Sequence, residues 1–292
     1  MVETIRSHCN ELRQLLSKKG PSSFKMVALD MDGTLLNRNH QLSNRTIASV
    51  KMIADAGLTV LLATGRMTSA VKNHLEKLGT PGLVVSHNGA LVKDVRTGQI
   101  YHHDTVPKEI VTKVLELLDG KETVIHFNFD DNIYLTASNP YSERYSQELQ
   151  VSLTYASSLK CFEGEPTSIL LMDNQEVLKQ VLTTVSNHFL GQFDYVIAPW
   201  QSDVWRLQFL ATNTSKGKGV LQVAKRLGVK PEEIISFGDS YNDMDMLQHT
   251  GLGIAMGNAV PELKQVADFV TFSNQEDGVA YVLEALYKSW NK

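Results

Sequence analysis

The stretch VALDMDGTLL, residues Val27–Leu36, is the part of the sequence from which the fold can be inferred most directly. The apolar residues 26–29 predict a strand that carries Asp30 to its carboxyl end, and Gly33 allows the chain to turn sharply there. Asp30 and Asp32 are alternate residues, so in an extended backbone their carboxylates face the same side. Two carboxylates at the end of a strand suit a cation site, or a nucleophile beside an acid/base.

The residues that follow predict helices and strands in alternation. Ser43 is a favoured helix N-cap, and Gly57 ends the helix that is expected to begin there. The segment LTVLLA is apolar on both faces, as a strand buried in a parallel sheet is. The expected elements are helices at 44–56 and 68–78 and strands at 58–63 and 83–86. This order with short connections predicts a parallel sheet with right-handed crossovers, a Rossmann-like α/β fold.

The pattern changes between Leu91 and about Leu210, where the expected strands alternate polar and apolar residues and come in pairs. One hairpin is expected to turn at Arg96-Thr97-Gly98, and a second at Asp130-Asp131-Asn132, between VIHFNF and IYLTA. Helices are expected at 108–118, 141–149 and 176–189. Paired strands with helices on one side predict an antiparallel α+β domain.

Beyond Thr214 the alternation returns, which predicts that the second domain is inserted into the first. The expected elements there are helices at 216–227, 243–248 and 279–289 and strands at 234–237, within 251–257 and at 267–270. We therefore expect a Rossmann-like core at 24–90 and 212–292, with an inserted α+β cap at 91–211. Residues 1–23 are expected to form an N-terminal extension, with an amphipathic helix over 4–16 that is followed by a break at Gly20-Pro21-Ser22-Ser23.

Composition limits the classes of function. The 292 residues carry a net charge of −4, and the basic stripe that nucleic-acid binding favours is missing from the sequence. An apolar run long enough to span a membrane is also missing, and the N-terminus does not resemble a secretion signal or a transit peptide. Two cysteines, Cys9 and Cys161, do not predict a disulfide framework. We expect a cytoplasmic protein that is a monomer or a small homo-oligomer.

Several polar residues are expected at the carboxyl ends of strands, where open parallel sheets bind ligands. They are Asp30 and Asp32, Thr64-Gly65, Lys216 at the start of a helix, and Asp239, Asn242 and Asp243 after a later strand. Each group has an ordinary explanation when taken singly: solvated aspartates at a turn, a helix cap, a surface lysine, and acidic residues at a helix N-terminus. Their occurrence together in this order is far more specific.

Together these groups resemble the four motifs of the haloacid dehalogenase (HAD) superfamily of hydrolases. The motifs correspond to DMDGTL at 30–35, TGR at 64–66, Lys216, and GDSYND at 238–243. With SHNGA at 86–90 and TSKGKGV at 214–220, the chain looks most like the Cof-type subfamily, whose members carry a large α+β cap (type C2) between the second and third motifs. The resemblance covers about Phe24 to Trp290.

The resemblance implies a role for each motif residue. Asp30 would attack phosphorus, because a carboxylate is ionised at neutral pH without the help of a base. Asp32 would protonate the leaving oxygen and then deprotonate the hydrolytic water, and Lys216 would neutralise charge on the transferring group. A Mg2+ ion is also implied, and the residues assigned to it are Asp30, Asp32 through its backbone carbonyl, Asp239, and Asp243, the last holding a metal-bound water or Lys216.

The phosphate-binding residues implied by the resemblance are Thr64, the Gly65 amide, Arg66, Asn88 and Asn242. Arg66 either contacts substrate or pairs with an acidic neighbour, and Asn88 either forms a plain turn or faces the active site at the hinge to the cap. The cap residues that could read the leaving group are His126, Asn128, Trp205 and Arg206, although packing or solvent exposure explains most such residues. Trp200 and Trp205 are expected in the core rather than in a stacking platform.

The expected function is Mg2+-dependent hydrolysis of small phosphorylated metabolites through an aspartyl-phosphate, because a large cap leaves a restricted cavity. Sugar phosphates are the leading substrate class. A phosphorylated cofactor or precursor, such as pyridoxal phosphate or a flavin intermediate, is the alternative. A phosphomutase would share the fold and the intermediate. A haloacid dehalogenase would not need Asp32, and a non-catalytic Mg2+-dependent interaction protein would need neither Asp32 nor Lys216.

Overall fold

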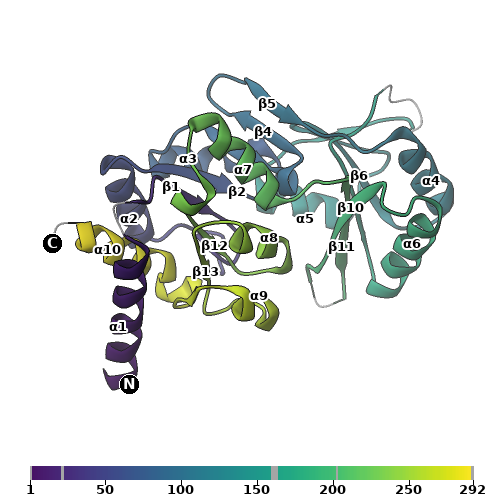
Figure 1. Ribbon diagram of the computed structural model, residues 1–292. Helices are drawn as coiled ribbons and strands as arrows, with labels where there is room; N and C mark the ends of the chain where they lie inside the picture. Colours follow the sequence, from purple (N-terminus) through teal and green to yellow (C-terminus); the bar gives the residue numbers. More distant parts are fainter. Residues whose placement is uncertain (1, 21–22, 159–163, 202, 291–292) are drawn as a thin grey trace.

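The computed structural model describes residues 2–20, 23–158, 164–201 and 203–290, with side chains from residue 10 onward (Figure 1). Two sheets, each with its own helices, lie side by side, and the expected α/β fold is confirmed. Cys161 and the Pro21-Ser22 part of the predicted break lie outside the described residues, as does the side chain of Cys9.

The larger sheet follows the order β14-β13-β12-β1-β2-β3-β4-β5. Its strands are β1 (Met26–Leu29), β2 (Thr59–Ala63), β3 (Leu83–Ser86), β4 (Leu91–Asp94), β5 (Ile100–His103), β12 (Ile234–Gly238), β13 (Leu252–Ala255) and β14 (Phe269–Val270). Strands from β14 to β3 are parallel, and β4 and β5 are antiparallel to their neighbours. All four residues of β1 are buried, as the apolar run predicts.

Two layers of helices cover this sheet. The members of one layer are α1 (Val2–Lys19), α2 (Asn44–Asp55), α3 (Lys72–Leu78) and α10 (Gly278–Trp290). The members of the other are α7 (Lys216–Leu227), α8 (Met244–Gln248) and α9 (Pro261–Val266). The Ser43 side chain accepts from the Thr46 amide and so caps α2, as predicted. The helix expected at 68–78 is divided into a 3-10 turn, Thr68–Val71, and α3. Leu12 and Leu16 of α1 are buried in the core of this sheet.

The smaller sheet follows the order β10-β11-β9-β6-β7-β8. Its strands are β6 (Val124–Phe129), β7 (Asn132–Leu135), β8 (Leu153–Tyr155), β9 (Ser168–Asp173), β10 (Phe193–Pro199) and β11 (Trp205–Ala211), and its helices are α4 (Lys108–Leu118), α5 (Pro140–Leu149) and α6 (Gln175–His188). Its strand pairs are antiparallel except β7 with β8, which is parallel.

Helices lie on both faces of the smaller sheet, so the prediction that they share one side is wrong. On β9, Ile169 and Leu171 face the cluster formed with α4 and α6, whereas Leu170 and Met172 face the cluster that includes Leu149 of α5. The segment SILLMD is buried along nearly its whole length. A continuous apolar run of this kind is typical of a strand covered on both faces.

The first boundary of the inserted region also differs from the prediction, which placed residues 91–211 in the cap. Strands β4 and β5 form the hairpin around Arg96-Thr97-Gly98, but β4 pairs with β3 and so extends the larger sheet. A hairpin turn is a local signal, whereas the sheet that a hairpin joins is decided by pairing with other strands. The chain leaves the larger sheet near Asp104 and returns near Thr214, where Thr214 Oγ1 donates to Asp104 Oδ2 at 3.3 Å.

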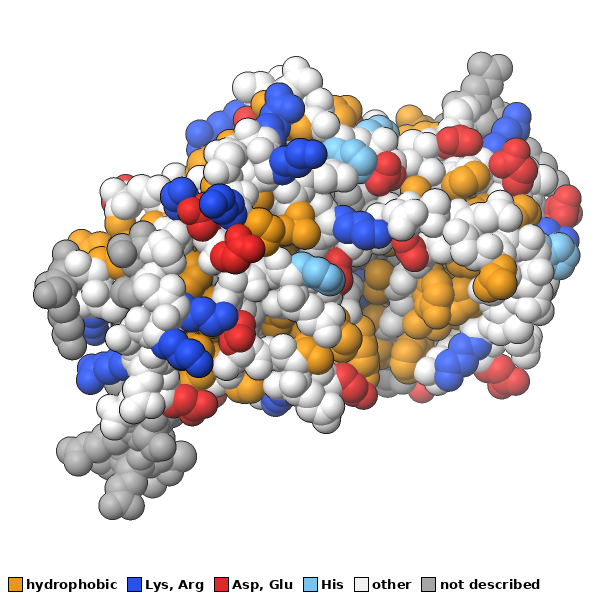
Figure 2. All heavy atoms as spheres, in the orientation of Figure 1, with side chains coloured by type: hydrophobic (Ala, Val, Ile, Leu, Met, Phe, Trp, Pro, Cys, Tyr) orange, Lys and Arg blue, Asp and Glu red, His pale blue; other side chains and the backbone are white. Residues whose placement is uncertain are grey.

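The visible surface agrees with the charge pattern of the sequence. On the face drawn in Figure 2, acidic and basic side chains are interspersed, and the surface is hollowed between the two lobes with hydrophobic side chains on the side of the smaller sheet. Within the described ranges, no helix has both the length and the apolar character needed to cross a membrane.

Candidate active site

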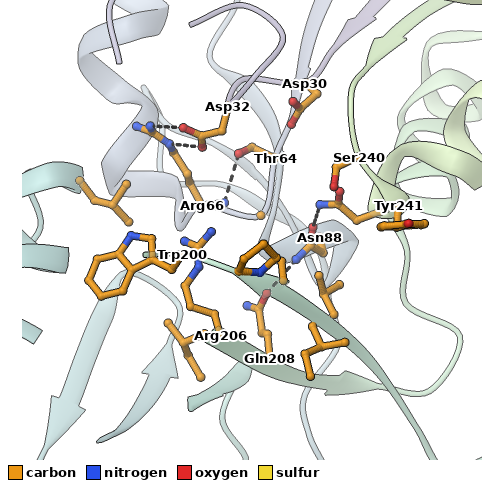
Figure 3. Close-up of a pocket in the computed structure, with 18 of the residues that line it drawn as sticks. Asp30, Asp32, Thr64, Arg66, Asn88, Trp200, Arg206, Gln208, Ser240 and Tyr241 are labelled. Carbon is orange, nitrogen blue, oxygen red and sulfur yellow. Dashed lines mark hydrogen bonds and ion pairs between the residues drawn. The ribbon is translucent and has the colours of Figure 1, made fainter. Parts of the chain in front are cut away.

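Three neighbouring parallel strands end together and bring the motif residues to one place (Figure 3). Asp30 follows β1, Thr64 follows β2 and Asp239 follows β12. The Ser215 side chain caps α7 by accepting from the Lys218 amide, which starts the helix at Lys216. These residues line one end of a cavity of about 490 Å³, and residues of the smaller sheet and α5 line the other end.

Lys216 is buried between two carboxylates. Its Nζ donates to Asp30 Oδ1 and to Asp243 Oδ1, each at 2.7 Å. Burial alone would lower the pKa of Lys216, but the carboxylates of Asp243 and Asp30 outweigh it and raise that pKa. The second oxygen of Asp30, Oδ2, is buried and has no hydrogen-bond partner in the described part of the chain. Asp30 therefore has one oxygen held by a permanent cation and one oxygen left open.

Asp30, Asp239 and Asp243 form an acidic cluster in which one oxygen from each lies within 4.8 Å of the others. Burial, with Asp30 and Asp243 nearby, raises the pKa of Asp239 to about 8. Burial raises the pKa of Asp30 to about 7 although Lys216 opposes it. The cluster has more negative charge than Lys216 alone balances. Oxygen donors of this kind and the open Asp30 Oδ2 fit a hard divalent cation.

Asp243 differs from the other two members because both of its oxygens are engaged. Its Oδ2 accepts from the backbone amides of Asp239 and Ser240, each at 3.0 Å, while its Oδ1 accepts from Lys216. It therefore shapes the loop that carries Asp239 and holds the lysine. These contacts favour the interpretation in which Asp243 holds Lys216 rather than a metal-bound water.

Gly33 lets the loop after β1 approach the loop after β12. Its φ of +82° is favourable for glycine, and a Cβ at this position would lie 2.2 Å from Asp239 Oδ2. The DxDG spacing thus has a geometric consequence: the turn brings the backbone of the first motif directly against the acidic side chain of the fourth.

Asp32 is held by Arg66 rather than pointing at Asp30. Arg66 Nε and Nη2 donate to its two oxygens at 2.7 and 2.6 Å, and His40 Nδ1 lies 3.2 Å from Oδ1. Partial desolvation opposes the ionisation of Asp32, whose side chain is 44% exposed, but the hydrogen bonds from Arg66 and His40 outweigh it and hold the pKa of Asp32 well below its usual range. Of the two interpretations of Arg66, this structure shows the pairing with an acidic neighbour.

His40 is a site residue that sequence reasoning missed. It lines the cavity and reaches Asp32 because Asn37 Oδ1 accepts from the backbone amides of Asn39 and Gln41 and so closes a tight turn. In the sequence, Asn37 is the residue that could have indicated this turn and so the position of His40.

A chain of amide hydrogen bonds links the loops after β3 and β12, which carry Asn88 and Asn242, to the smaller sheet. Asn242 Nδ2 donates to Asn88 Oδ1 at 2.8 Å, and Asn88 Nδ2 donates to Gln208 Oε1 at 2.7 Å. Gly65 lies close beside it, since a Cβ there would be 3.1 Å from the Asn88 amide. Asn88 and Asn242 thus lie next to Thr64-Gly65. Gln208 was not predicted, although it occupies the same face of β11 as Arg206 by strand alternation.

The backbone turns sharply at this junction. His87, Asn88 and Gly89 have φ values of 47°, 55° and 107°, and a Cβ on Gly89 would lie 2.1 Å from the Ser215 carbonyl oxygen. His87 Nε2 lies 3.1 Å from the Asp130 carbonyl, which can only accept, so Nε2 carries the proton and Nδ1 accepts from Ser168 Oγ. Burial lowers the pKa of His87 to about 4, so the ring is neutral.

The far end of the cavity is built by the smaller sheet and α5. The Trp200 ring is held by a hydrogen bond from Nε1 to Glu148 Oε2 at 3.2 Å and by an edge contact with Tyr145, with ring centroids 6.1 Å apart. Glu148 also accepts from Arg144 Nε at 2.7 Å. Trp200 lines the cavity rather than being wholly in the core as expected.

The four cap residues considered from the sequence have different locations. Trp205 packs on the opposite face of the sheet with α4 and α6, as expected for a core residue. His126 is buried and bonds Ser142 Oγ at 2.7 Å, and Asn128 donates to Ser168 Oγ at 2.9 Å. Arg206 alone of these four lines the cavity.

Known proteins resemble this chain over nearly its whole length. The model of the family described as haloacid dehalogenase-like hydrolase matches residues 27–283. The putative phosphatase YxeH of Bacillus subtilis is 31% identical over 271 residues, which cover 90% of this chain and 98% of that protein. The 5-amino-6-(5-phospho-D-ribitylamino)uracil phosphatase YitU of the same organism is 26% identical, with coverage of 90% and 97%. Among solved structures, the HAD subclass IIB sugar phosphatase BT4131 is 25% identical with a TM-score of 0.76, covering 89% of this chain and 98% of that one.

Proposed function

Because this chain belongs to the haloacid dehalogenase-like hydrolase family and is a phosphatase, we propose that it hydrolyses small phosphorylated metabolites, sugar phosphates foremost, with Mg2+ and through an aspartyl-phosphate on Asp30. The observation that carries this proposal is the uneven environment of the two Asp30 oxygens. Lys216 holds Oδ1 at 2.7 Å and Oδ2 has no partner among the described residues. A carboxylate held in this way is oriented for attack. Burial raises the pKa of Asp30 to about 7, so a cation at the site would keep it ionised, and the ionised form needs no general base.

Mg2+ is the cation that these residues fit. Asp30 Oδ2 and the Asp239 carboxylate would hold it, with the Asp32 backbone carbonyl as the further protein ligand that the family resemblance implies. When bound, Mg2+ offsets the repulsion between an anionic nucleophile and an anionic substrate. Lys216 and Asp243 then keep the nucleophile and the Asp239 loop in place.

The reaction proceeds in two steps on this chain's own residues. A carboxylate oxygen of Asp30 bonds to phosphorus as the bond from phosphorus to the ester oxygen breaks, and the leaving oxygen takes a proton from Asp32. Water then attacks phosphorus, Asp32 takes back a proton, and the bond from phosphorus to Asp30 breaks to release inorganic phosphate. Lys216 stabilises the charge on the transferring group, and Thr64 and the Gly65 amide lie where its oxygens would bind.

Asp32 has to change partners to serve this role. Its double contact with Arg66 favours the ionised form, which accepts a proton but cannot donate one. An arriving phosphoryl group competes for the same guanidinium, because phosphate and carboxylate bind arginine with the same geometry. We therefore assign Arg66 to the bound phosphoryl group during turnover. Asp32, released from Arg66, takes up a proton from solvent and then gives that proton to the leaving oxygen.

A cavity of about 490 Å³, lined at its far end by the smaller sheet and α5, favours a small molecule as the leaving group. The similarity to a sugar phosphatase supports the leading class. The similarity to a phosphatase of a ribityl-substituted uracil, together with the ring of Trp200 at the cavity wall, supports a phosphorylated cofactor precursor as the second candidate.

Phosphate release from a panel of sugar phosphates and phosphorylated cofactor precursors, with Mg2+ and after its removal, tests the proposal. We expect Mg2+-dependent release with no isomerised product, which also excludes a phosphomutase. Asp30→Asn should lower kcat at least about a thousandfold, and Asp55→Asn, an exposed aspartate at the end of α2, should not. Near-normal turnover by Asp30→Asn would contradict the assignment of the nucleophile.

A further inference from the structure

The cationic side chains that line the cavity each pair with a carboxylate, with one exception among the described residues. Lys216 pairs with Asp30 and Asp243, Arg66 with Asp32, and Arg144 with Glu148, each with a nitrogen–oxygen distance of 2.6 or 2.7 Å. Arg206 lines the same cavity and is half-buried, and its guanidinium makes no hydrogen bond or ion pair with any residue that the structure describes. A partly buried guanidinium without an anion is unfavourable, so a partner from outside the chain would be favoured there.

Strand alternation places Arg206 beyond the phosphate end of the cavity. Arg206 and Gln208 are on the same face of β11, and Gln208 accepts from Asn88 beside the phosphate-end loops. Two residues along a strand put the Cα of Arg206 about 7 Å from that of Gln208. Figure 3 shows its side chain rising from β11 toward Arg66 and Trp200.

The electrostatic influence of Arg206 agrees with this position. Burial raises the pKa of the Tyr145 hydroxyl, and the Arg206 charge is the largest opposing influence on it. The charges that act on Asp30 are instead Lys216, Asp243 and Asp32. Arg206 is thus near the α5 wall, where the leaving group would lie, rather than at the nucleophile.

We propose that Arg206 binds a second anionic group on the leaving group, a carboxylate or a second phosphate, and that the enzyme prefers phosphomonoesters that carry one. The proposal rests on the proposed function and names the substrate class of the same site. A guanidinium offers two parallel N–H donors that match either group. The ring of Trp200, fixed by Glu148 and Tyr145, flanks the same space and gives the carbon chain between the two anions an apolar surface.

Two pairs of substrates that differ in the second anion test this proposal. D-3-Phosphoglycerate is compared with glycerol 3-phosphate, and fructose 1,6-bisphosphate with fructose 1-phosphate, so that the pairs distinguish a carboxylate from a phosphate. The wild type should favour the doubly anionic member of at least one pair by about tenfold or more in kcat/KM. In Arg206→Gln the preference should fall to about twofold or less, with kcat/KM for the singly anionic member nearly unchanged.

A control arginine and a binding measurement complete the test. Arg144→Gln removes a cation from the same cavity that Glu148 already pairs, so the substrate preference should persist. In the inactive Asp30→Asn background, calorimetry should show tighter binding of the doubly anionic ester, and Arg206→Gln should abolish the difference. Circular dichroism checks that Arg206→Gln is folded, and Arg206→Lys, which keeps the charge, should retain part of the preference.

The outcomes separate this proposal from the proposed function. Asp30-dependent hydrolysis with no preference, or with a preference that survives Arg206→Gln, overturns the role of Arg206 and leaves the phosphatase intact. An equal loss for both members of a pair also overturns it, because Arg206 would then contact the transferred phosphoryl group. If none of the four esters is hydrolysed, calorimetry in the Asp30→Asn background still decides the role of Arg206. Absence of Asp30-dependent hydrolysis across the wider metabolite panel would contradict the proposed function instead.

Discussion

At the scale of single residues, the raised pKa values of Asp30 and Asp239 would link the proposed metal binding to pH. Carboxyl groups of an unfolded chain titrate near pH 4, whereas burial raises the pKa of Asp30 to about 7 and that of Asp239 to about 8. Between these values the folded protein binds more protons than the unfolded chain. The stabilisation that results is complete below about pH 4 and is lost as the pH rises through about 7 and about 8. A cation needs the same carboxylates ionised, so it opposes this loss.

We therefore predict that Mg2+ stabilises the protein more at about pH 9 than at about pH 6. Thermal unfolding followed by fluorimetry in excess EDTA, and again in excess Mg2+, measures the difference in Tm. In EDTA, Asp239→Asn should raise Tm at the higher pH, because its neutral amide replaces one of the buried charges. The same substitution should reduce the rise in Tm that Mg2+ produces. A gain from Mg2+ that is the same at both pH values would contradict the linkage.

At the scale of elements, β1 and the turn after it determine how closely the loop after β1 approaches the loop after β12. β1 begins and ends where its apolar run predicts, and α4 and α7 have the predicted bounds. The apolar run of β1 and the Ser215 and Gly228 caps of α7 are local signals. Two predictions were wrong: which sheet the β4–β5 hairpin joins, and which face of the smaller sheet α5 covers. Both depend on contacts with strands that are distant in the sequence. Local chemistry thus predicts where an element lies in the chain, and long-range packing decides what it contacts.

Gly33→Ala should weaken Mg2+ binding beyond its effect on stability. Both Gly33 and Gly98 have a positive φ, of +82° and +75°, but a Cβ on Gly98 meets nothing within 4 Å, whereas one on Gly33 collides with Asp239. Each alanine should cost about 1–2 kcal/mol of unfolding free energy from the backbone conformation alone. Only Gly33→Ala should also raise the Mg2+ concentration for half-maximal activity, by about tenfold. Equal metal titrations in the two variants would show that the turn does not position Asp239.

At the scale of the whole molecule, polar contacts join the two sheets. Lys93 of β4 donates to Asp130 and Asp131 at 2.6 and 2.7 Å, and His87 contacts Ser168 at 3.2 Å. The motifs predicted residues that the structure brings together at one end of the cavity, because each motif consists of a few consecutive residues. The junction could not be predicted in this way, since Asn88 and Gln208 are separated by 120 residues and single polar residues give no periodic signal.

Lys93→Met should loosen the smaller sheet at its β6–β7 turn. The substitution leaves two partly buried carboxylates without their cation and should lower the unfolding free energy by about 1–3 kcal/mol. Hydrogen–deuterium exchange should accelerate in residues 124–135. Lys113→Met, which removes a more exposed pair with Glu116 on α4, is the control and should change neither quantity noticeably. Similar exchange in the two variants would mean that Lys93 does not anchor this turn.

The contact between Thr214 and Asp104 also bears on how the specificity of such a protein can diverge. Because the chain leaves the larger sheet and re-enters it at adjacent points, we expect that the segment between them can be exchanged without changing the order of β1, β12 and α7, which position Asp30, Asp239 and Lys216. Recombination at Asp104 and Thr214 would combine a new substrate-recognition segment with the same catalytic residues. One catalytic platform can thus acquire a range of substrates through exchanges at a single position in its architecture.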